Sequence, residues 1–142
     1  MALDYALTIA GTIPLQQILE RAFPTGAERP GVEHQGKVWI AKDLFERHGF
    51  DMRWRNATNG YHSVDMNGQT WTWEPKEYTR VSFRLNKSFD RKRALATVQK
   101  VVSRLLASGT EDMALLFNGE VLLVLRMSGD LRRYGAAREW TL

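Results

Sequence analysis

Histidine is the first residue type to search for chemistry in this sequence, because the chain contains no cysteine. His34, His48 and His62 are isolated, and no two of them have the helical or strand spacing of a metal-binding pair. His62 and Asp65 are three residues apart, which on a strand directs the two side chains to opposite faces. The histidines therefore predict neither a metal site nor a catalytic dyad.

Catalytic sequence motifs are also missing. No Gly-x-Ser-x-Gly, Walker or dinucleotide glycine pattern occurs, and Gly119, Gly129 and Gly135 do not follow a strand-to-helix junction, as a phosphate loop requires. The carboxylates are scattered, so acid–base chemistry stays open only for a pair that folding brings together. We predict that the chain is not an enzyme, needs no cofactor and acts by binding.

Four arginines form the candidate partner-binding surface. They are Arg53 and Arg55 on one predicted strand and Arg80 and Arg84 on another. Each alternates with apolar residues, so all four are expected on the polar face of a sheet, where like charges repel unless something pairs with them. Two interpretations are open. The arginines pair within the chain, with Asp51, Glu74 or Glu77, or they bind a partner, since arginine favours bidentate contact with carboxylate or phosphate and is common at binding hot spots.

The net charge of +4 is concentrated in residues 76–104. This block holds nine Lys or Arg side chains against Glu77 and Asp90, a net charge of +7. The block indicates one positive surface, which is either a solvated helix face or a surface that attracts an acidic partner.

The tryptophans allow two readings as well. Trp71 and Trp73 are two residues apart and so share one face of a strand, and we expect Trp54 to join them across the sheet. The group is either part of the core or a surface that stacks on a partner or on nucleic-acid bases.

The elements that position these residues follow from hydrophobic periodicity. The first half predicts a strand over residues 3–9, a helix capped by Thr12 and ended by Pro24, a long loop over 24–37, a short strand over 38–40 and a short helix over 43–47 closed by Gly49. Four strands in a row are then expected between residues 50 and 85. Asn59-Gly60 and Asn67-Gly68 predict tight turns between them, and so an antiparallel meander.

The second half predicts the longest helix, at about 90–107 with Asp90 as its cap, and a final hairpin of residues 113–117 and 120–126. The run Val121–Leu125 is apolar on both faces, so this strand should be covered on both sides. The resulting fold class is α+β: an antiparallel sheet of about six or seven strands with helices packed on one face. A length of 142 residues fits one domain, 1–142.

The N-terminal segment carries Asp4 and no basic leader, so it is read as a strand and not as a signal peptide. No stretch approaches the roughly 18 apolar residues that span a membrane. We therefore expect a cytoplasmic protein that does not bind membranes.

Four stretches of the chain resemble the Sit-type immunity proteins of bacterial contact-dependent kin-discrimination systems. In order, they are ALDYALTIAGTIPLQQILERAFP, KDLFERHGF, WEPKEYTRVSFRLNK and SGTEDMALLFNGEVLLVLRMSGDL. The resemblance implies a small cytoplasmic protein that binds and neutralises one cognate toxin, and it brings no catalytic residues. Since inhibitors of basic nucleases are usually acidic, a basic immunity protein implies a toxin with an acidic face, or a contact that avoids residues 76–104.

The alternative hypothesis is a nucleic-acid-binding module that uses the basic block 76–104. It predicts binding that weakens steeply with salt, because phosphate contacts release counterions. The sequence contains no nucleic-acid-binding fingerprint, and the oligomeric state does not follow from it.

Overall fold

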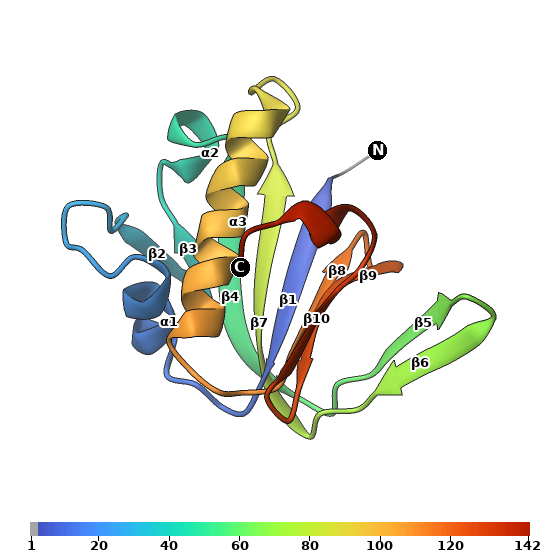
Figure 1. Cartoon of the computed structure of the whole chain (residues 1–142). Helices are drawn as coiled ribbons and strands as arrows, with labels where there is room; N and C mark the ends of the chain where they lie inside the picture. Colours follow the sequence, from blue (N-terminus) through green and yellow to red (C-terminus); the bar gives the residue numbers. More distant parts are fainter. Residues whose placement is uncertain (1–2) are drawn as a thin grey trace.

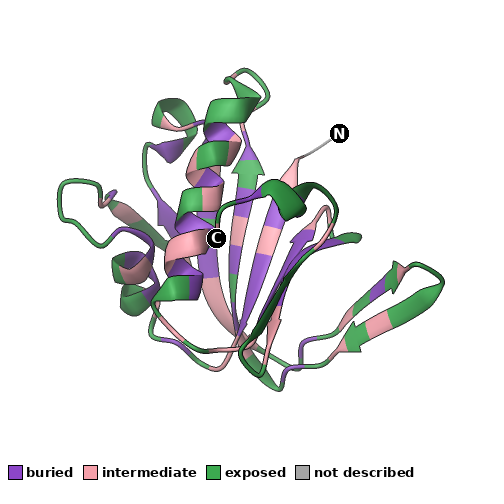
Figure 2. Cartoon of the chain, in the orientation of Figure 1, coloured by how far each residue is buried: buried purple, intermediate pink, exposed green. Residues whose placement is uncertain are grey.

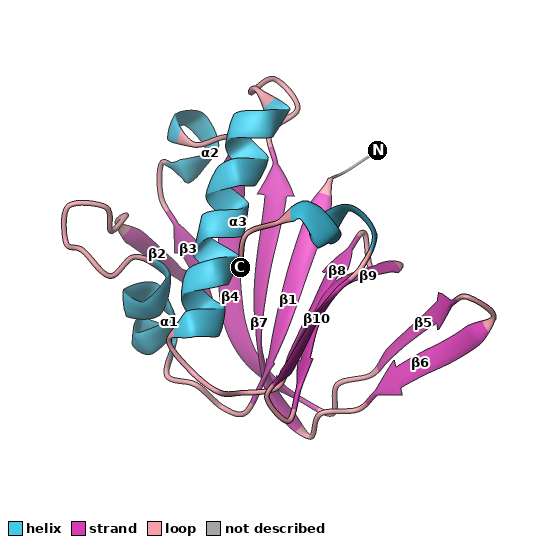
Figure 3. Cartoon of the chain, viewed as in Figure 1, coloured by secondary structure: helices cyan, strands magenta, loops and turns pink. Residues whose placement is uncertain are grey.

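Eight antiparallel strands form one sheet in the computed structural model, which describes residues 3–142 (Figures 1 and 3). Across the sheet the strands are β10 (Asp130–Arg133), β9 (Val121–Met127), β8 (Met113–Phe117), β1 (Asp4–Ala10), β7 (Glu77–Leu85), β4 (Phe50–Thr58), β3 (Val38–Ala41) and β2 (Val32–Gln35). At the centre, β1 pairs with β7 along seven residues, from Asp4 opposite Arg84 to Ala10 opposite Tyr78. The α+β antiparallel class is confirmed.

Helices cover one face of this sheet, as expected. They are α1 (Leu15–Ala22), the single turn α2 (Leu44–Arg47) and α3 (Arg91–Ala107), and Figure 1 shows α3 crossing in front of the central strands. The buried stripe of α3 consists of Ala94, Val98, Val101, Val102, Leu105 and Leu106. It belongs to the same core as Leu7 and Ile9 of β1, which are fully buried. Figure 2 shows buried residues along the central strands behind α3. The 3-10 turn η1 (Gly135–Glu139) places Ala137 in the same core.

The helix caps show where local signals succeed and fail. Asp90 caps α3, since its Oδ1 accepts hydrogen bonds from the backbone N–H groups of Lys92 and Arg93 at 3.0 and 3.3 Å. The expected cap by Thr12 is wrong. The residue before α1 is Pro14, and the Thr12 hydroxyl donates instead to Glu77 Oε2 at 3.2 Å.

The expected meander is also wrong. Strand β4 pairs directly with β7 along nine residues, while β5 (His62–Met66) and β6 (Gln69–Trp73) form a separate two-stranded hairpin at the lower right of Figure 1. At the neck of this hairpin, the backbone N–H groups of Asn59 and Gly60 donate to the carbonyls of Lys76 and Pro75 at 2.8 and 2.9 Å. These bonds continue the β4–β7 ladder, so Asn59-Gly60 does not form a tight turn.

The hairpin β5–β6 covers the sheet face opposite α3 over β8 and β9. Val64, at 4% exposure, joins a second hydrophobic cluster with Ala114, Leu116, Leu122 and Leu125, and Trp71 and Trp73 pack against it. Residues 122–125 of β9 are therefore covered on both sides, as the sequence predicted, whereas Val121 at the start of the strand is exposed. Trp54 does not join the hairpin tryptophans. It is 1% exposed beneath the helices, and its indole N–H donates to the Leu15 carbonyl at 3.0 Å.

Two edge strands were not expected from the sequence. Strand β2 lies inside the predicted loop 24–37, and β10 lies in the tail. Both are only four residues long and largely exposed, so their side chains carry little hydrophobic alternation. The main sheet therefore gains β2 and β10 but lacks β5 and β6, which the expected meander had included.

Candidate functional site

The half of the sheet face that the hairpin leaves uncovered carries all four candidate arginines. Because strands β4 and β7 alternate, Val81, Phe83 and Leu85 point into the core under α3, and the arginines point the other way. Arg53, Arg80 and Arg84 are exposed and Arg55 is half-buried. We call this surface the open face. The structure brings the four side chains together, and their role in binding stays a prediction.

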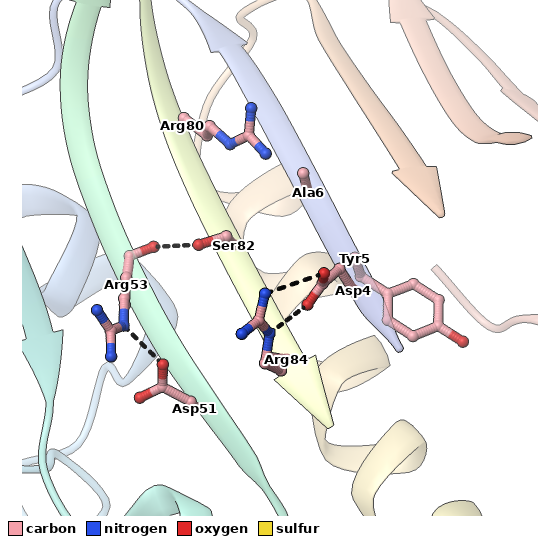
Figure 4. A pocket seen from close by; sticks show the side chains of 8 residues that line it. All are labelled: Asp4, Tyr5, Ala6, Asp51, Arg53, Arg80, Ser82 and Arg84. Carbon is pink, nitrogen blue, oxygen red and sulfur yellow. Dashed lines mark hydrogen bonds and ion pairs between the residues drawn. The ribbon is translucent and has the colours of Figure 1, made fainter. Parts of the chain in front are cut away.

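The upper end of the open face, which is uppermost in Figure 1 and lowermost in Figure 4, is balanced in charge. Arg84 lies opposite Asp51 on β4 and opposite Asp4 on β1. Its Nε forms an ion pair with Asp4 Oδ1 at 2.8 Å, and Arg53 Nε forms another with Asp51 Oδ2 at 2.7 Å (Figure 4). The hydrogen bond and the charge of Asp4 raise the pKa of Arg84 above its usual value. Internal pairing therefore accounts for two of the four arginines.

The lower end of the open face is not balanced. Arg55 and Arg80 lie directly opposite each other on β4 and β7, and Thr8 of β1 completes this row. No ion pair or side-chain hydrogen bond among residues 3–142 includes either guanidinium group. In Figure 4 the Arg80 side chain extends toward β1 and bonds to none of the other residues drawn. We call Arg55 and Arg80 the arginine pair.

His62, at the base of the hairpin, lies near Arg80 of the arginine pair. Its ring stacks on Trp73 with centroids 5.7 Å apart, and its Nε2 is buried without a hydrogen-bond partner. Burial, together with the nearby positive charge of Arg80, holds the pKa of His62 below its usual value. The neutral ring thus forms an uncharged side to the lower end of the open face.

Two adjoining cavities lie on the floor of the open face. One, of about 280 Å³, is lined by Asp4, Tyr5, Ala6, Asp51, Arg53, Arg80, Ser82 and Arg84. The other, of about 190 Å³, is lined by Val38, Arg53, Trp54, Arg55, Arg80 and Ser82. Drug-sized ligands and cofactors usually fill about 300–1,000 Å³, so these hollows suit the side chains of a docking partner better than an enclosed small molecule.

The family of the chain can now be stated beside this geometry. A family model described as SitI3-like matches residues 3–142. The chain belongs to the SitI3-like family. No curated protein and no solved structure gives a significant match. The family name agrees with the resemblance to Sit-type immunity proteins and suggests an immunity protein with a non-enzymatic role.

The remaining candidate groups of this SitI3-like protein are dispersed. His34 stacks on Trp39 at 4.3 Å in an exposed position, and His48 ends α2. Residues 3–142 contain no group of three or more His, Asp or Glu side chains that could hold a metal ion. Over the same range, no helix has both the length and the apolar character needed to cross a membrane.

The basic block of the SitI3-like chain is split between the two sides of the sheet. Arg80 and Arg84 lie on the open face, while Arg91, Lys92 and Lys100 belong to α3 on the opposite side (Figure 1). Residues 76–104 therefore do not form the single positive surface that the sequence suggested. The cause is topological, since β7 and α3 are consecutive elements in different layers.

Sequence reasoning missed Asp4 and His62 as neighbours of the arginines. Asp4 is 80 residues from Arg84, and only the β1–β7 register brings them together. The only signal in the sequence was that Asp4 alternates with the apolar Tyr5, which places Asp4 on the polar face of its strand. The position of His62 depends on the hairpin leaving the sheet, for which the sequence has no comparable signal.

Proposed function

We propose that this SitI3-like chain is an immunity protein that binds and neutralises one cognate bacterial toxin by direct protein–protein contact. It acts as a single domain in the cytoplasm of the protected cell and carries out no reaction. The membership of residues 3–142 in the SitI3-like family is the observation that carries the proposal. The resemblance to kin-discrimination immunity proteins supports the same reading.

The toxin docks on the open face, through Arg53, Arg55, Arg80 and Arg84. This face supports the assignment because it is the part of the sheet that neither the helices nor the hairpin β5–β6 cover. Arginine is enriched at binding hot spots, where its planar group makes several directed hydrogen bonds. The two floor cavities offer depressions for toxin side chains.

Co-expression with the product of the adjacent reading frame tests the function. Cells that carry the neighbouring product alone should stop growing, and cells that also express this chain should grow. An Arg80→Glu/Arg84→Glu variant should fold but lose protection, while the matched variant Lys92→Glu/Lys100→Glu, which reverses two charges on α3, should still protect. The proposal fails if the neighbouring product is harmless or remains toxic when the wild-type chain is present.

The alternative, a nucleic-acid-binding module, has less support from the geometry. Its basic block lies on two sides of the sheet, and Trp71 and Trp73 pack against the second hydrophobic cluster rather than forming a free stacking surface. A salt titration with mixed DNA and RNA separates the two functions. Phosphate contacts would give affinity that falls steeply with salt.

A further inference from the structure

We propose that the arginine pair, Arg55 and Arg80, is the point on the open face that receives a carboxylate side chain of the partner protein. This inference rests on the proposed function for the identity of that partner. It goes further because it distinguishes two of the four arginines from the other two. It also states the chemistry of the matching position on the toxin.

The charge of the open face changes from one cross-strand row to the next. The upper row contains Asp51, Arg84 and Asp4, the middle row Arg53, Ser82 and Ala6, and the lower row Arg55, Arg80 and Thr8. The upper row is thus net negative, the middle row carries one positive charge and the lower row carries two. Because Arg53 and Arg84 already have carboxylate partners, the unneutralised charge is concentrated in the lower row.

The cross-strand register of the arginine pair places the two side chains within reach of one shared anion. Side chains directly opposite each other on antiparallel strands have Cβ atoms roughly 4.5–5.5 Å apart, and like charges in such positions repel. The Arg80 side chain extends toward β1 (Figure 4), so it would turn toward Arg55 when a carboxylate binds over this row. The carboxylate would then offset the repulsion and accept charge-assisted hydrogen bonds from both guanidinium groups. The hollow of about 190 Å³ that Arg55 and Arg80 line together has room for a single side chain.

The surroundings of the arginine pair favour a protein carboxylate over a polyphosphate chain. Asp4 and Asp51 flank Arg84, four residues along β7 from Arg80, which corresponds to about 13 Å on a strand. A nucleic-acid backbone that followed the strands would meet these two carboxylates after leaving the arginine pair. A protein segment can place an acidic side chain at the lower row and a neutral or basic one at the upper row.

A peptide titration tests the pair without requiring the toxin. The probe is the capped peptide acetyl-Glu-Gly-Glu-amide at low ionic strength, with acetyl-Gln-Gly-Gln-amide as its uncharged control. We expect the Nε–Hε NMR signals of Arg55 and Arg80 to shift saturably with the Glu peptide only. An Arg55→Gln/Arg80→Gln variant should lose this binding, and Lys92→Gln/Lys100→Gln, with the same change in net charge, should keep it.

Three outcomes of the titration would overturn the proposal. They are no saturable shift at the arginine pair, equal shifts at the α3 lysines, or a response to inorganic phosphate and a short oligonucleotide with none to the Glu peptide. The last outcome would indicate phosphate recognition.

The purified toxin from the adjacent reading frame then tests whether the site is used. The Arg55→Gln/Arg80→Gln variant should bind it at least about 30-fold more weakly than the wild type, because a desolvated charge contact is lost. The α3 lysine variant should stay within about twofold, as expected for rim charges distant from the contact. Equal toxin binding by the wild type and the arginine variant would overturn the proposal. If the wild type does not bind the toxin at all, the proposed function fails, and the peptide titration alone decides whether the arginine pair receives carboxylates.

Discussion

Replacing Glu111 by Gln removes the one carboxylate that faces two nearly buried arginines, Arg21 and Arg126, near the C-terminal end of α3. Arg21 donates to both Glu111 oxygens at 2.9 Å and also to the Leu105 carbonyl at 2.6 Å. Arg126 donates to the Leu106 carbonyl at 2.7 Å, and its Nη2 lies 4.0 Å from Glu111 Oε1. The side chains of Arg21 and Arg126 are only 12% and 11% exposed, against 27% for Glu111. The glutamine therefore leaves two poorly solvated charges without their counter-charge.

The size of the effect follows from this geometry. Hydrogen bonds to charged groups contribute about 1.5–3 kcal/mol, and breaking a fully buried pair costs about 3–5 kcal/mol. Since Glu111 remains partly solvated, we expect Glu111→Gln to lower the free energy of unfolding by about 2–3 kcal/mol. For 142 residues, the average unfolding entropy converts this loss into a Tm lower by about 7–10 °C.

The pH dependence gives a second, independent readout. Burial alone would raise the pKa of Glu111, but hydrogen bonds from Arg21 and its own backbone N–H, with the charges of Arg21 and Arg126, hold the pKa below its usual value. A carboxyl whose pKa is lower in the folded state stabilises the fold above its ordinary pKa of about 4.3 and loses that contribution as the pH falls through the lower value. The difference in Tm between the wild type and Glu111→Gln should therefore become smaller toward about pH 3.

Thermal unfolding followed by circular dichroism at pH 7 and at about pH 3 measures both quantities. Glu120→Gln, in the exposed turn between β8 and β9, is the matched control and should leave Tm unchanged. The reasoning is refuted if Glu111→Gln unfolds within about 2 °C of the wild type at pH 7. An equal Tm difference at both pH values would refute the claim that the charge of Glu111 stabilises the fold.

Three further outcomes are expected. Trp54→Phe should destabilise the fold by about 2 kcal/mol in urea titrations, because it leaves the Leu15 carbonyl without its 3.0 Å hydrogen bond and creates a void in the core. Because burial and Arg80 lower the pKa of His62, the unfolded chain takes up a proton before the folded chain does as the pH falls. The free energy of unfolding should therefore decrease below about pH 6.5. His62→Gln should reduce this decrease, as measured by urea titrations at about pH 7.5 and 5.5. Asp90→Ala removes the cap of α3 and should cost about 1 kcal/mol by the same measurement, whereas Asp90→Ser should retain most of the stability.

Local signals in the sequence predicted local conformation well. Asn67-Gly68 has φ values of 48° and 80°, and Asn118-Gly119 has 51° and 70°, as a type I′ turn requires of both residues. At Asn59-Gly60 only the asparagine has positive φ, at 55°. A Cβ on Gly60 would lie 2.9 Å from Pro75, so this glycine serves close packing at the neck of the hairpin and not a tight turn. The dipeptide is the same, but the tertiary contact that decides its conformation lies outside the local sequence.

Hydrophobic periodicity does not predict which strands pair or in which register. Alternation placed Arg53, Arg55, Arg80 and Arg84 on the polar face correctly, because the direction of a side chain depends only on its own strand. Which side chain lies opposite depends on register, and so the Asp4–Arg84 ion pair was missed. The same limit explains Trp54. Alternation predicts which side of its own strand Trp54 is on, but it does not predict how far this side chain lies from the hairpin β5–β6.

The pairing of the main sheet does not depend on the hairpin β5–β6, but the polarity of the sheet surface does. Strands β4 and β7 remain bonded up to Asn59 and Lys76, so the residues between them could be exchanged for a short connection while the eight strands stay joined. Such a trimmed chain would uncover Ala114, Leu116, Leu122 and Leu125, an apolar strip beside the open face. The hairpin thus keeps an apolar strip out of solvent, and strips of this kind promote association when they are exposed.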